Sequence, residues 1–321
     1  MKKYIIIAFI SLLTITTFIK IITEPIHPHQ EIAAAQKAPV FIFDLNGVLF
    51  DTDTMTVLRQ LGIKDALWYL ARYRSPRMLK IRFYETLHRI TQTRTNIHNI
   101  KDPDGTIMPQ LMLEWLQGVH ANKILLQRTI DAIKNNPQWF LNATEQRLMM
   151  GMARAIFDPE QFVASRKLLD DLVPLIIHLK KEHGAKLYVL SNWDKESFGL
   201  LKSRFAHVFN WFDGCIISGE VGHVKPQREI YAHTHILHKN HAPHICFLDD
   251  QLENLNASKH FGWHTIQVNK TPSYFGFLSN IDSDIITKGV LTFLETKPVE
   301  IIPSVLKKAE LSLPKEVYAT E

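Results

Sequence analysis

The chain contains little cysteine, with only Cys215 and Cys246 among its 321 residues. Each falls in a separate apolar run that we interpret as a strand, so small buried side chains are the expected identity rather than a disulfide framework. Internal repeats and low-complexity tracts are also absent from the sequence. A hydrophobic content of 46% and a charged content of 21% are typical of ordinary folded proteins, and the length suggests two lobes plus tails.

Acidic residues are scarce between positions 72 and 101, where Glu85 is the only one. The basic residues there are Arg72, Arg74, Arg77, Lys80, Arg82, Arg89, Arg94 and Lys101. Such a run attracts anions, whether phosphate substrates, lipid head groups or nucleic acid. A solvated helix face is the simpler interpretation, and the formal net charge of +5 does not by itself indicate a nucleic-acid partner.

Charge is also absent from the stretch Tyr4 to Ile19, which follows the basic pair Lys2 and Lys3. This pattern predicts an export signal or a membrane anchor over residues 4–22. Ala33-Ala34-Ala35 resembles a cleavage site, so both an uncleaved anchor and a cleaved signal stay open, with a buried helix as the less favoured alternative. Either would place the remainder in the periplasm or another extracytoplasmic space, with a membrane contact if the segment is retained. Residues 1–37 form this segment and its linker.

The segment Pro39 to Phe43 carries no charge and reads as a buried parallel strand. Asp44 follows at its carboxyl end, where ligands bind in open α/β sheets. Gly47 allows a tight turn that brings backbone N–H groups close to an anion. We therefore expect a functional site directly after this strand.

Strand signals then stop for more than a hundred residues, and apolar residues recur at helical spacing. They return as apolar runs at 187–190, 215–217, 244–248 and 264–268, with helical stretches between most of them. We predict a core formed by residues 38–52 and 183–272, a helical insert over 53–182, and a C-terminal region over 273–321. That last region contains one predicted helix, Ile285 to Leu294, and an extended tail.

Three pieces with polar chemistry follow in order after Asp44: Ser191-Asn192, Lys225-Pro226, and Asp249-Asp250 with Asn254. With them the chain resembles the haloacid dehalogenase (HAD) superfamily, and in particular the subgroup whose helical cap is inserted after the first motif. The segment from Gly222 to Tyr231 is similar to that subgroup's third motif. The segment from Phe247 to Asn254 is similar to its fourth motif. The resemblance implies a doubly wound parallel α/β sheet, a HAD-like Rossmannoid core, with an inserted all-helical cap domain.

The resemblance also implies a hydrolase of the phosphatase type that uses Mg²⁺. Asp44 would be the nucleophile, while Asp44, the backbone carbonyl of Asn46, Asp249 and Asp250 would be metal ligands. Ser191, Asn192 and backbone N–H groups near Gly47 would bind the phosphate. Lys225 would hold the acids and the phosphate together, and Asn254 would orient the acidic pair. The expected substrate is a small phosphorylated or other anionic molecule.

Asn46 departs from the family's pattern, in which phosphatases carry a second Asp at this position for acid–base catalysis. An amide donates a hydrogen bond but exchanges no proton at neutral pH, and general acid–base catalysis contributes roughly 10²–10⁴ in rate. Three interpretations follow: a Mg²⁺-dependent phosphohydrolase with weakened turnover of poor leaving groups, a catalytically reduced module that binds phosphorylated ligands, and a metal-independent dehalogenase-like hydrolase. The paired Asp249-Asp250 favours a metal over the third.

Two further expectations concern the core. The family's strand order places the strands of Cys215 and Cys246 on opposite sides of the central pair, too far apart for a disulfide. His235, His238 and His241 step by three along a predicted helix. A solvent-facing helix is the simpler interpretation of these histidines, with a Zn²⁺ site as the alternative.

Overall fold

The computed structural model describes residues 38–73, 76–102, 104–238, 244–272 and 279–296. The expected signal or anchor segment over residues 1–37 and the expected tail beyond residue 296 lie outside the described residues. Within the part that is described, no helix has both the length and the apolar character needed to cross a bilayer.

A parallel sheet of five described strands organises the core, in the order β5-β4-β1-β6-β7. Its strands are β1 (Val40–Phe43), β4 (Lys186–Ser191), β5 (Gly214–Ile217), β6 (Ile245–Asp249) and β7 (His264–Gln267). The order places β5 and β6 on opposite sides of the β4–β1 pair, as expected, and both Cys215 and Cys246 are free thiols. The α/β prediction is therefore confirmed.

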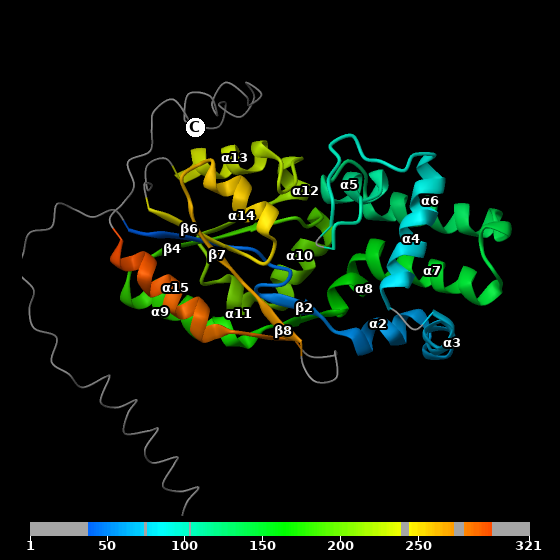
Figure 1. The fold of residues 1–321 in the computed structure, drawn as a ribbon, viewed down its shortest axis with the longest axis horizontal. Helices are drawn as coiled ribbons and strands as arrows, with labels where there is room; N and C mark the ends of the chain where they lie inside the picture. Colours follow the sequence, from blue (N-terminus) through cyan, green and yellow to red (C-terminus); the bar gives the residue numbers. More distant parts are fainter. Residues whose placement is uncertain (1–37, 74–75, 103, 239–243, 273–278, 297–321) are drawn as a thin grey trace, which may run out of the picture. The chain divides into compact units, whose positions relative to one another are not determined.

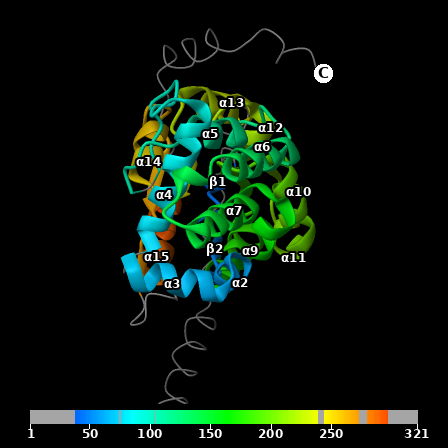
Figure 2. The same ribbon diagram turned by 90° about the vertical axis from the view of Figure 1, so that its right-hand side faces the viewer.

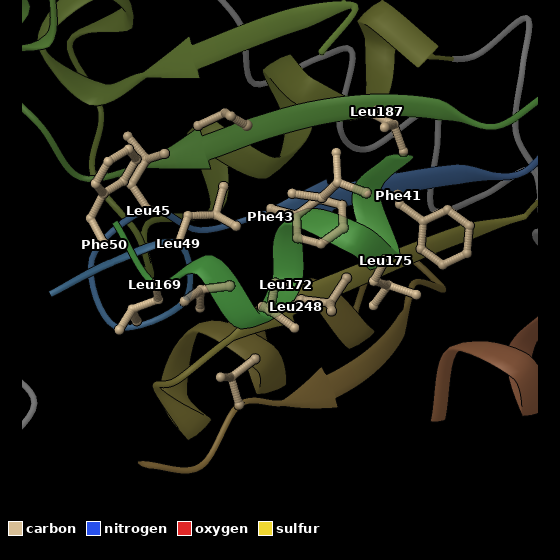
Figure 3. Packing of buried hydrophobic residues seen from close by; sticks show 14 of the residues in the cluster. Phe41, Phe43, Leu45, Leu49, Phe50, Leu169, Leu172, Leu175, Leu187 and Leu248 are labelled. Carbon is tan, nitrogen blue, oxygen red and sulfur yellow. The ribbon is translucent and has the colours of Figure 1, made fainter. Parts of the chain in front are cut away.

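Alternate side chains of β1 supply the two faces of the sheet, because successive residues of a strand point to opposite sides. Phe41 and Phe43 lie in one buried cluster, and Figure 3 shows them packed near Leu172, Leu175 and Leu248. Helices α9 (Val173–Glu182) and α15 (Ser283–Glu295) cover this face (Figure 1).

The opposite face of the sheet is built from the remaining residues of β1. Val40 and Ile42 belong to a second buried cluster, together with residues of α13 (Arg228–His238) and α14 (Leu252–Lys259). Figure 1 shows α13 and α14 on this side, away from α9 and α15. Helices on both faces explain why the strands are nearly continuous apolar runs.

Two short antiparallel strands mark where the helical insert leaves and rejoins the core. β2 (Phe50–Thr52) pairs with β3 (Arg166–Leu168), so that Thr52 lies opposite Arg166. The helices between them are α2 (Thr54–Leu61), α3 (Ile63–Tyr73), α4 (Pro76–Thr91), α5 (Gln110–Leu116), α6 (Asn122–Asn135), α7 (Ala143–Phe157) and α8 (Pro159–Ala164), with a 3₁₀ turn at Pro137–Trp139. They enclose their own buried cluster, which includes Leu111, Trp115 and Phe157, and Figure 2 views them from that side.

Some segments that the sequence assigned outside the core contribute to it. Leu175, Ile176 and Leu179 of α9 lie in the cluster of β1, although the range 53–182 was assigned to the insert. Ile286 and Val290 of α15 lie in the same cluster, so this helix packs as a core element. The last helix of the insert in the described part of the chain is α8, which ends at Ala164.

The remaining core helices are α10 (Lys195–Arg204), α11 (Ala206–Phe209) and α12 (Ser218–Val221), and the chain also forms the hairpin of β8 (Lys270–Pro272) and β9 (Ser279–Ile281). The insert is bonded to the loop after β4: Asn122 Nδ2 donates to Asp194 Oδ1 at 2.9 Å. Ser218 Oγ donates to the carbonyl of Leu116 at 2.6 Å. These buried hydrogen bonds join the insert to the core beside the carboxyl ends of the strands.

Part of the basic run of residues 72–101 is paired with acidic residues within the insert. Lys80 forms ion pairs with Asp102 and Asp104, and Arg82 does so with Glu85 and Glu145. Phe83 of the same helix is fully buried. The part of the run that lies in α4 thus has a buried side and a charged side, which agrees with the simpler of the two interpretations.

The solvent-facing interpretation of the histidine series is wrong for His235. This side chain is buried, accepts a hydrogen bond from Trp263 Nε1 at 3.2 Å, stacks on the ring of Trp263 and contacts the ring of Phe261 at a tilt. Its burial lowers the pKa of His235, which fits a neutral imidazole. His241 and the side chain of His238 lie outside the described part of the chain.

Candidate active site

Three acidic side chains converge at the carboxyl edge of the sheet. Asp44 follows β1, and Asp249 with Asp250 ends the neighbouring strand β6. One carboxylate oxygen from each of these three residues lies within 4.8 Å of those from the other two. Parallel strands bring their carboxyl ends to one edge, so residues two hundred positions apart in sequence meet here.

Lys225 joins two of these acids. Its Nζ lies 2.7 Å from Asp249 Oδ2 and 2.9 Å from Asp44 Oδ1, and its side chain is buried. Burial of the ammonium opposes its charge, but Asp249 and Asp44 outweigh that effect and raise the pKa of Lys225. Lys225 is therefore a fixed cation between the two carboxylates.

Asn192 positions Lys225 through the backbone. Its Oδ1 accepts from the Lys225 N–H at 2.7 Å, and its Nδ2 donates to the Lys225 carbonyl at 2.9 Å. We expected Asn192 to bind phosphate, but both polar atoms of its side chain are engaged in this clamp. Because Nδ2 carries two N–H groups, the clamp leaves one side-chain donor in addition to the backbone N–H for contact with a substrate.

Asp44 is held by three donors on one oxygen. Its Oδ1 accepts from Ser191 Oγ at 2.7 Å, from the Leu45 N–H at 2.7 Å, and from Lys225. Ser191 ends β4, the strand next to β1, which explains why its hydroxyl reaches the carboxylate. No hydrogen bond between described residues engages Asp44 Oδ2. The bonds to Oδ1 therefore orient the carboxylate and leave Oδ2 without a hydrogen-bond donor among these residues.

Asp249 is oriented in the same manner by Asn254. The Asn254 amide donates to both oxygens of Asp249 at 3.1 Å, and the Gln251 N–H donates to Oδ1 at 2.8 Å. Burial raises the pKa of Asp249 to about 6, because Lys225 only partly offsets the loss of hydration and the nearby Asp44 adds to the rise.

Gly47 has a different role in the site from the anion-binding role that was expected. Its backbone N–H donates to the carbonyl of Phe50 at 2.7 Å within the turn, so it is not available to bind an anion. Instead, a Cβ at Gly47 would lie 2.2 Å from Asp250 Oδ2, and its φ is +93°. Only glycine leaves room for the Asp250 carboxylate beside this turn.

Asn46 is exposed at the same turn and contacts a residue that sequence reasoning missed. Arg166 Nη1, from the hinge strand β3, donates to Asn46 Oδ1 at 3.3 Å. No motif or spacing marks Arg166 in the sequence, since it comes from the far end of the insert, 120 positions away. Only the pairing of β2 with β3 brings it to the site.

Comparison with known families identifies the family to which this fold belongs. A family model described as haloacid dehalogenase-like hydrolase matches residues 38–262, which is more than half of the chain. The chain belongs to the haloacid dehalogenase-like hydrolases. This HAD-like hydrolase carries its acidic cluster, Ser191 and Lys225 within the matched range.

Among curated proteins, the HAD-like hydrolase is similar to bifunctional epoxide hydrolase 2 of Rattus norvegicus and of Mus musculus. Each is 30% identical over 115 residues, which is 35% of this chain and 21% of the relative. The chain thus matches about a fifth of the length of these relatives.

The chain is also similar to solved structures at low identity. A HAD family enzyme of Bacteroides thetaiotaomicron is 15% identical, with a TM-score of 0.47 over 74% of this chain and 97% of that one. A predicted HAD-like family hydrolase of Porphyromonas gingivalis is 16% identical, with a TM-score of 0.46 over 81% and 100%.

The donor set suits a hard divalent cation. Three carboxylates lie around one lysine, so the cluster has an excess of negative charge that a divalent ion would offset. Oxygen ligands are those that Mg²⁺ prefers, and the glycine at position 47 leaves space for one of them. Asp44, Asp249 and Asp250 are the residues that would hold the ion.

Proposed function

We propose that this HAD-like hydrolase is a Mg²⁺-dependent phosphohydrolase that acts on a small phosphorylated molecule through Asp44. The observation that supports this most strongly is the convergence of Asp44, Asp249 and Asp250 within 4.8 Å, with Lys225 bonded between two of them. A bound Mg²⁺ would reduce the repulsion between an anionic nucleophile and an anionic phosphate.

The chain's own residues supply the rest of the chemistry. An oxygen of Asp44 attacks phosphorus and forms an aspartyl phosphate, while the bond to the leaving oxygen breaks and its electron pair stays on that oxygen. Ser191 and Lys225, already bonded to Asp44, are placed to donate to the transferring phosphoryl oxygens. Water then attacks phosphorus, releasing phosphate and restoring the Asp44 carboxylate.

Asn46 determines which leaving groups the site can release. Its amide can donate a hydrogen bond to the departing oxygen but can give it no proton. Water that attacks the aspartyl phosphate likewise loses its proton to solvent, without help from this residue. We therefore expect slow turnover, with good leaving groups preferred over alkoxides.

A second candidate function rests on the same residue. Asn46 is exposed and its Oδ1 accepts a hydrogen bond from Arg166, so the residue at this position supplies an amide and a neighbouring cation where a phosphatase of the family has an acid. A module that binds phosphorylated ligands with little turnover would keep the acidic cluster and Lys225 and need no acid. A metal-independent dehalogenase-like activity has less support, since it gives no reason for Asp250 beside Asp249.

Hydrolysis of p-nitrophenyl phosphate by the full chain, with MgCl₂ or with EDTA, tests the proposal. We expect Mg²⁺-dependent release of p-nitrophenol that disappears in Asp44→Asn. Binding of inorganic phosphate by calorimetry with no turnover would favour the second candidate. Cleavage of a 2-haloacid at equal rates in MgCl₂ and EDTA would overturn both. Export through residues 4–22 remains a proposal from the sequence, which membrane fractionation of cells that express the full chain would test.

A further inference from the structure

Arg166 lies where the hinge of the insert meets the acidic cluster. It belongs to β3, directly opposite Thr52 of β2, and its Nη1 donates to Thr52 Oγ1 at 2.6 Å and to Asn46 Oδ1 at 3.3 Å. Asn46 is two residues after the proposed nucleophile Asp44. The guanidinium is thus one hydrogen bond away from the position that handles the leaving group.

Aromatic rings fix the guanidinium in this place. Its central carbon lies 4.2 Å from the ring centroid of Phe162 and 6.0 Å from that of Trp193, and Nε donates to the Phe162 carbonyl at 3.3 Å. Trp193 follows Ser191 and Asn192 in the loop after β4, so this ring belongs to the segment that holds Asp44. Cation–π contacts and hydrogen bonds together restrict the side chain to one orientation.

The charge of Arg166 is retained at neutral pH. Burial lowers the pKa of the guanidinium to about 10, with Asp51 acting in the opposite direction. A partly desolvated cation interacts more strongly with a nearby negative charge than a fully hydrated one does. Arg166 is therefore suited to stabilise an anion that develops beside it.

Arg166 also decides which atom of Asn46 faces a ligand. A guanidinium has donors only, so the amide oxygen of Asn46 must be turned toward it. The amide nitrogen is then the polar atom left to face the exposed side of the turn. Asn46 is consequently fixed as a hydrogen-bond donor, and it sits next to a second donor.

We propose that Arg166 and the Asn46 amide nitrogen form a leaving-group subsite that stabilises the departing oxygen as an anion. This inference rests on the proposed phosphohydrolase function and deepens it by naming the substrate class. The substrates are phosphate compounds whose leaving oxygen departs without a proton, namely acyl, enol and aryl phosphates. As the bond between phosphorus and that oxygen breaks, the electron pair stays on the oxygen, and the two donors supply hydrogen bonds in place of a proton.

A structural brace in the hinge is the competing account of Arg166, because it also bonds Thr52 and the Phe162 carbonyl. The two accounts differ in their dependence on the leaving group. A brace affects all substrates equally, whereas a group that stabilises charge on the leaving oxygen matters most where that charge is least stable.

The test is a plot of log kcat/KM against leaving-group pKa for a series of aryl phosphates, from p-nitrophenyl to phenyl phosphate, with the full chain and MgCl₂. We expect Arg166→Gln to lower kcat/KM by about tenfold for p-nitrophenyl phosphate and by about 10²-fold for phenyl phosphate. Arg166→Lys, which keeps the charge, should restore part of this loss. Asn46→Ala, at an exposed position, should steepen the plot in the same manner.

Arg204→Gln is the matched control, since Arg204 also bonds an insert carbonyl, that of Val163, at 2.9 Å and stacks on an aromatic ring, that of Phe205. Its plot should run parallel to that of the unmodified protein. Equal losses for every substrate in Arg166→Gln and an unchanged slope in Asn46→Ala would overturn the subsite and leave the phosphohydrolase proposal intact. Absence of Mg²⁺-dependent hydrolysis across the series in the unmodified protein would overturn the proposed function itself.

Discussion

Gly47 and Asp250 are in such close approach that a Cβ on the glycine would lie 2.2 Å from Asp250 Oδ2. Gly47 therefore shapes the acidic cluster by leaving space, while its own N–H is used inside the turn. The contact joins the turn after β1 to the end of β6. It explains why glycine, which has no side chain to take part in catalysis, is important at this position.

Gly47→Ala is expected to lower Mg²⁺ affinity and kcat/KM by roughly 10–100-fold, because Asp250 must move out of place. Its positive φ of +93° adds about 1–2 kcal/mol of backbone strain. Gly184→Ala is the matched control, since Gly184 also has a positive φ but nothing within 4 Å of an added Cβ. Calorimetric Mg²⁺ titration separates the two effects, and equal affinities in both variants would contradict the steric role of Gly47.

Lys225→Met should destabilise the protein by about 3–5 kcal/mol, because it leaves Asp44 and Asp249 buried without their cation. Lys80→Met is the control. Lys80 also joins two aspartates, but it is partly exposed, and we expect a change of less than about 1 kcal/mol. Urea unfolding measures both, and similar midpoints would show that the buried pair does not stabilise the fold.

Mg²⁺ itself should raise the melting temperature, since an ion that binds only the folded cluster stabilises it by about 2–3 kcal/mol at a hundredfold excess over its Kd. Asp250→Asn should lose most of this shift. Asp213→Asn should keep it, because Asp213 is bonded to Lys180 and Lys186 elsewhere in the core. A shift of equal size in all three proteins would mean that the ion acts outside the cluster.

Asn46→Asp should raise kcat for phenyl phosphate by up to about 10²-fold, since a carboxyl at this position can exchange protons. The Arg166 guanidinium, 3.3 Å from the present amide oxygen, would lower the pKa of the new carboxyl. The gain in proton donation should therefore be largest at low pH, where the new carboxyl is protonated, and adding Arg166→Gln should move the high-pH limb of the profile to higher pH. An unchanged rate in Asn46→Asp across all pH values would remove this account of position 46.

His235 should make folding sensitive to acid. Burial lowers the pKa of His235 below its ordinary value of 6.5, so the unfolded chain binds a proton more readily than the folded one. The free energy of unfolding contributed by this group is full above pH 6.5 and decreases below it, by at most about 1.4 kcal/mol per pH unit. His235→Gln should weaken this dependence, whereas His207→Gln, at an exposed position, should leave it unchanged; urea unfolding between pH 7 and 5 measures both.

Much of the core could be predicted because its signals are local. Uncharged runs such as Pro39 to Phe43 end in polar residues, and this pattern alone indicates buried parallel strands with a site at their ends. Asp44, Ser191 and Asp249 were found in this way and Lys225 through the resemblance to the family, and the structure brings the four together.

Predictions that depend on nonlocal packing differed more from the structure. The helical character of α9 is plain from its apolar spacing, but only its packing against β1 and β4 shows that it belongs to the core. The clamp of Asn192 on the Lys225 backbone gives no sequence signal, because amide side chains have many possible partners.

The sequence by itself determined which residues carry charge and which buried strands end in polar residues. The reason is that local patterns of apolar residues indicate which segments are buried strands and where along the chain they end. Tertiary structure alone decided the use of each residue: Gly47 as a space for Asp250, Asn192 as a clamp on Lys225, and Arg166 as the cation beside Asn46. The physical reason is distance along the chain. Hydrogen bonds and steric contacts depend on separations of a few ångströms, which strand pairing sets between residues more than a hundred positions apart.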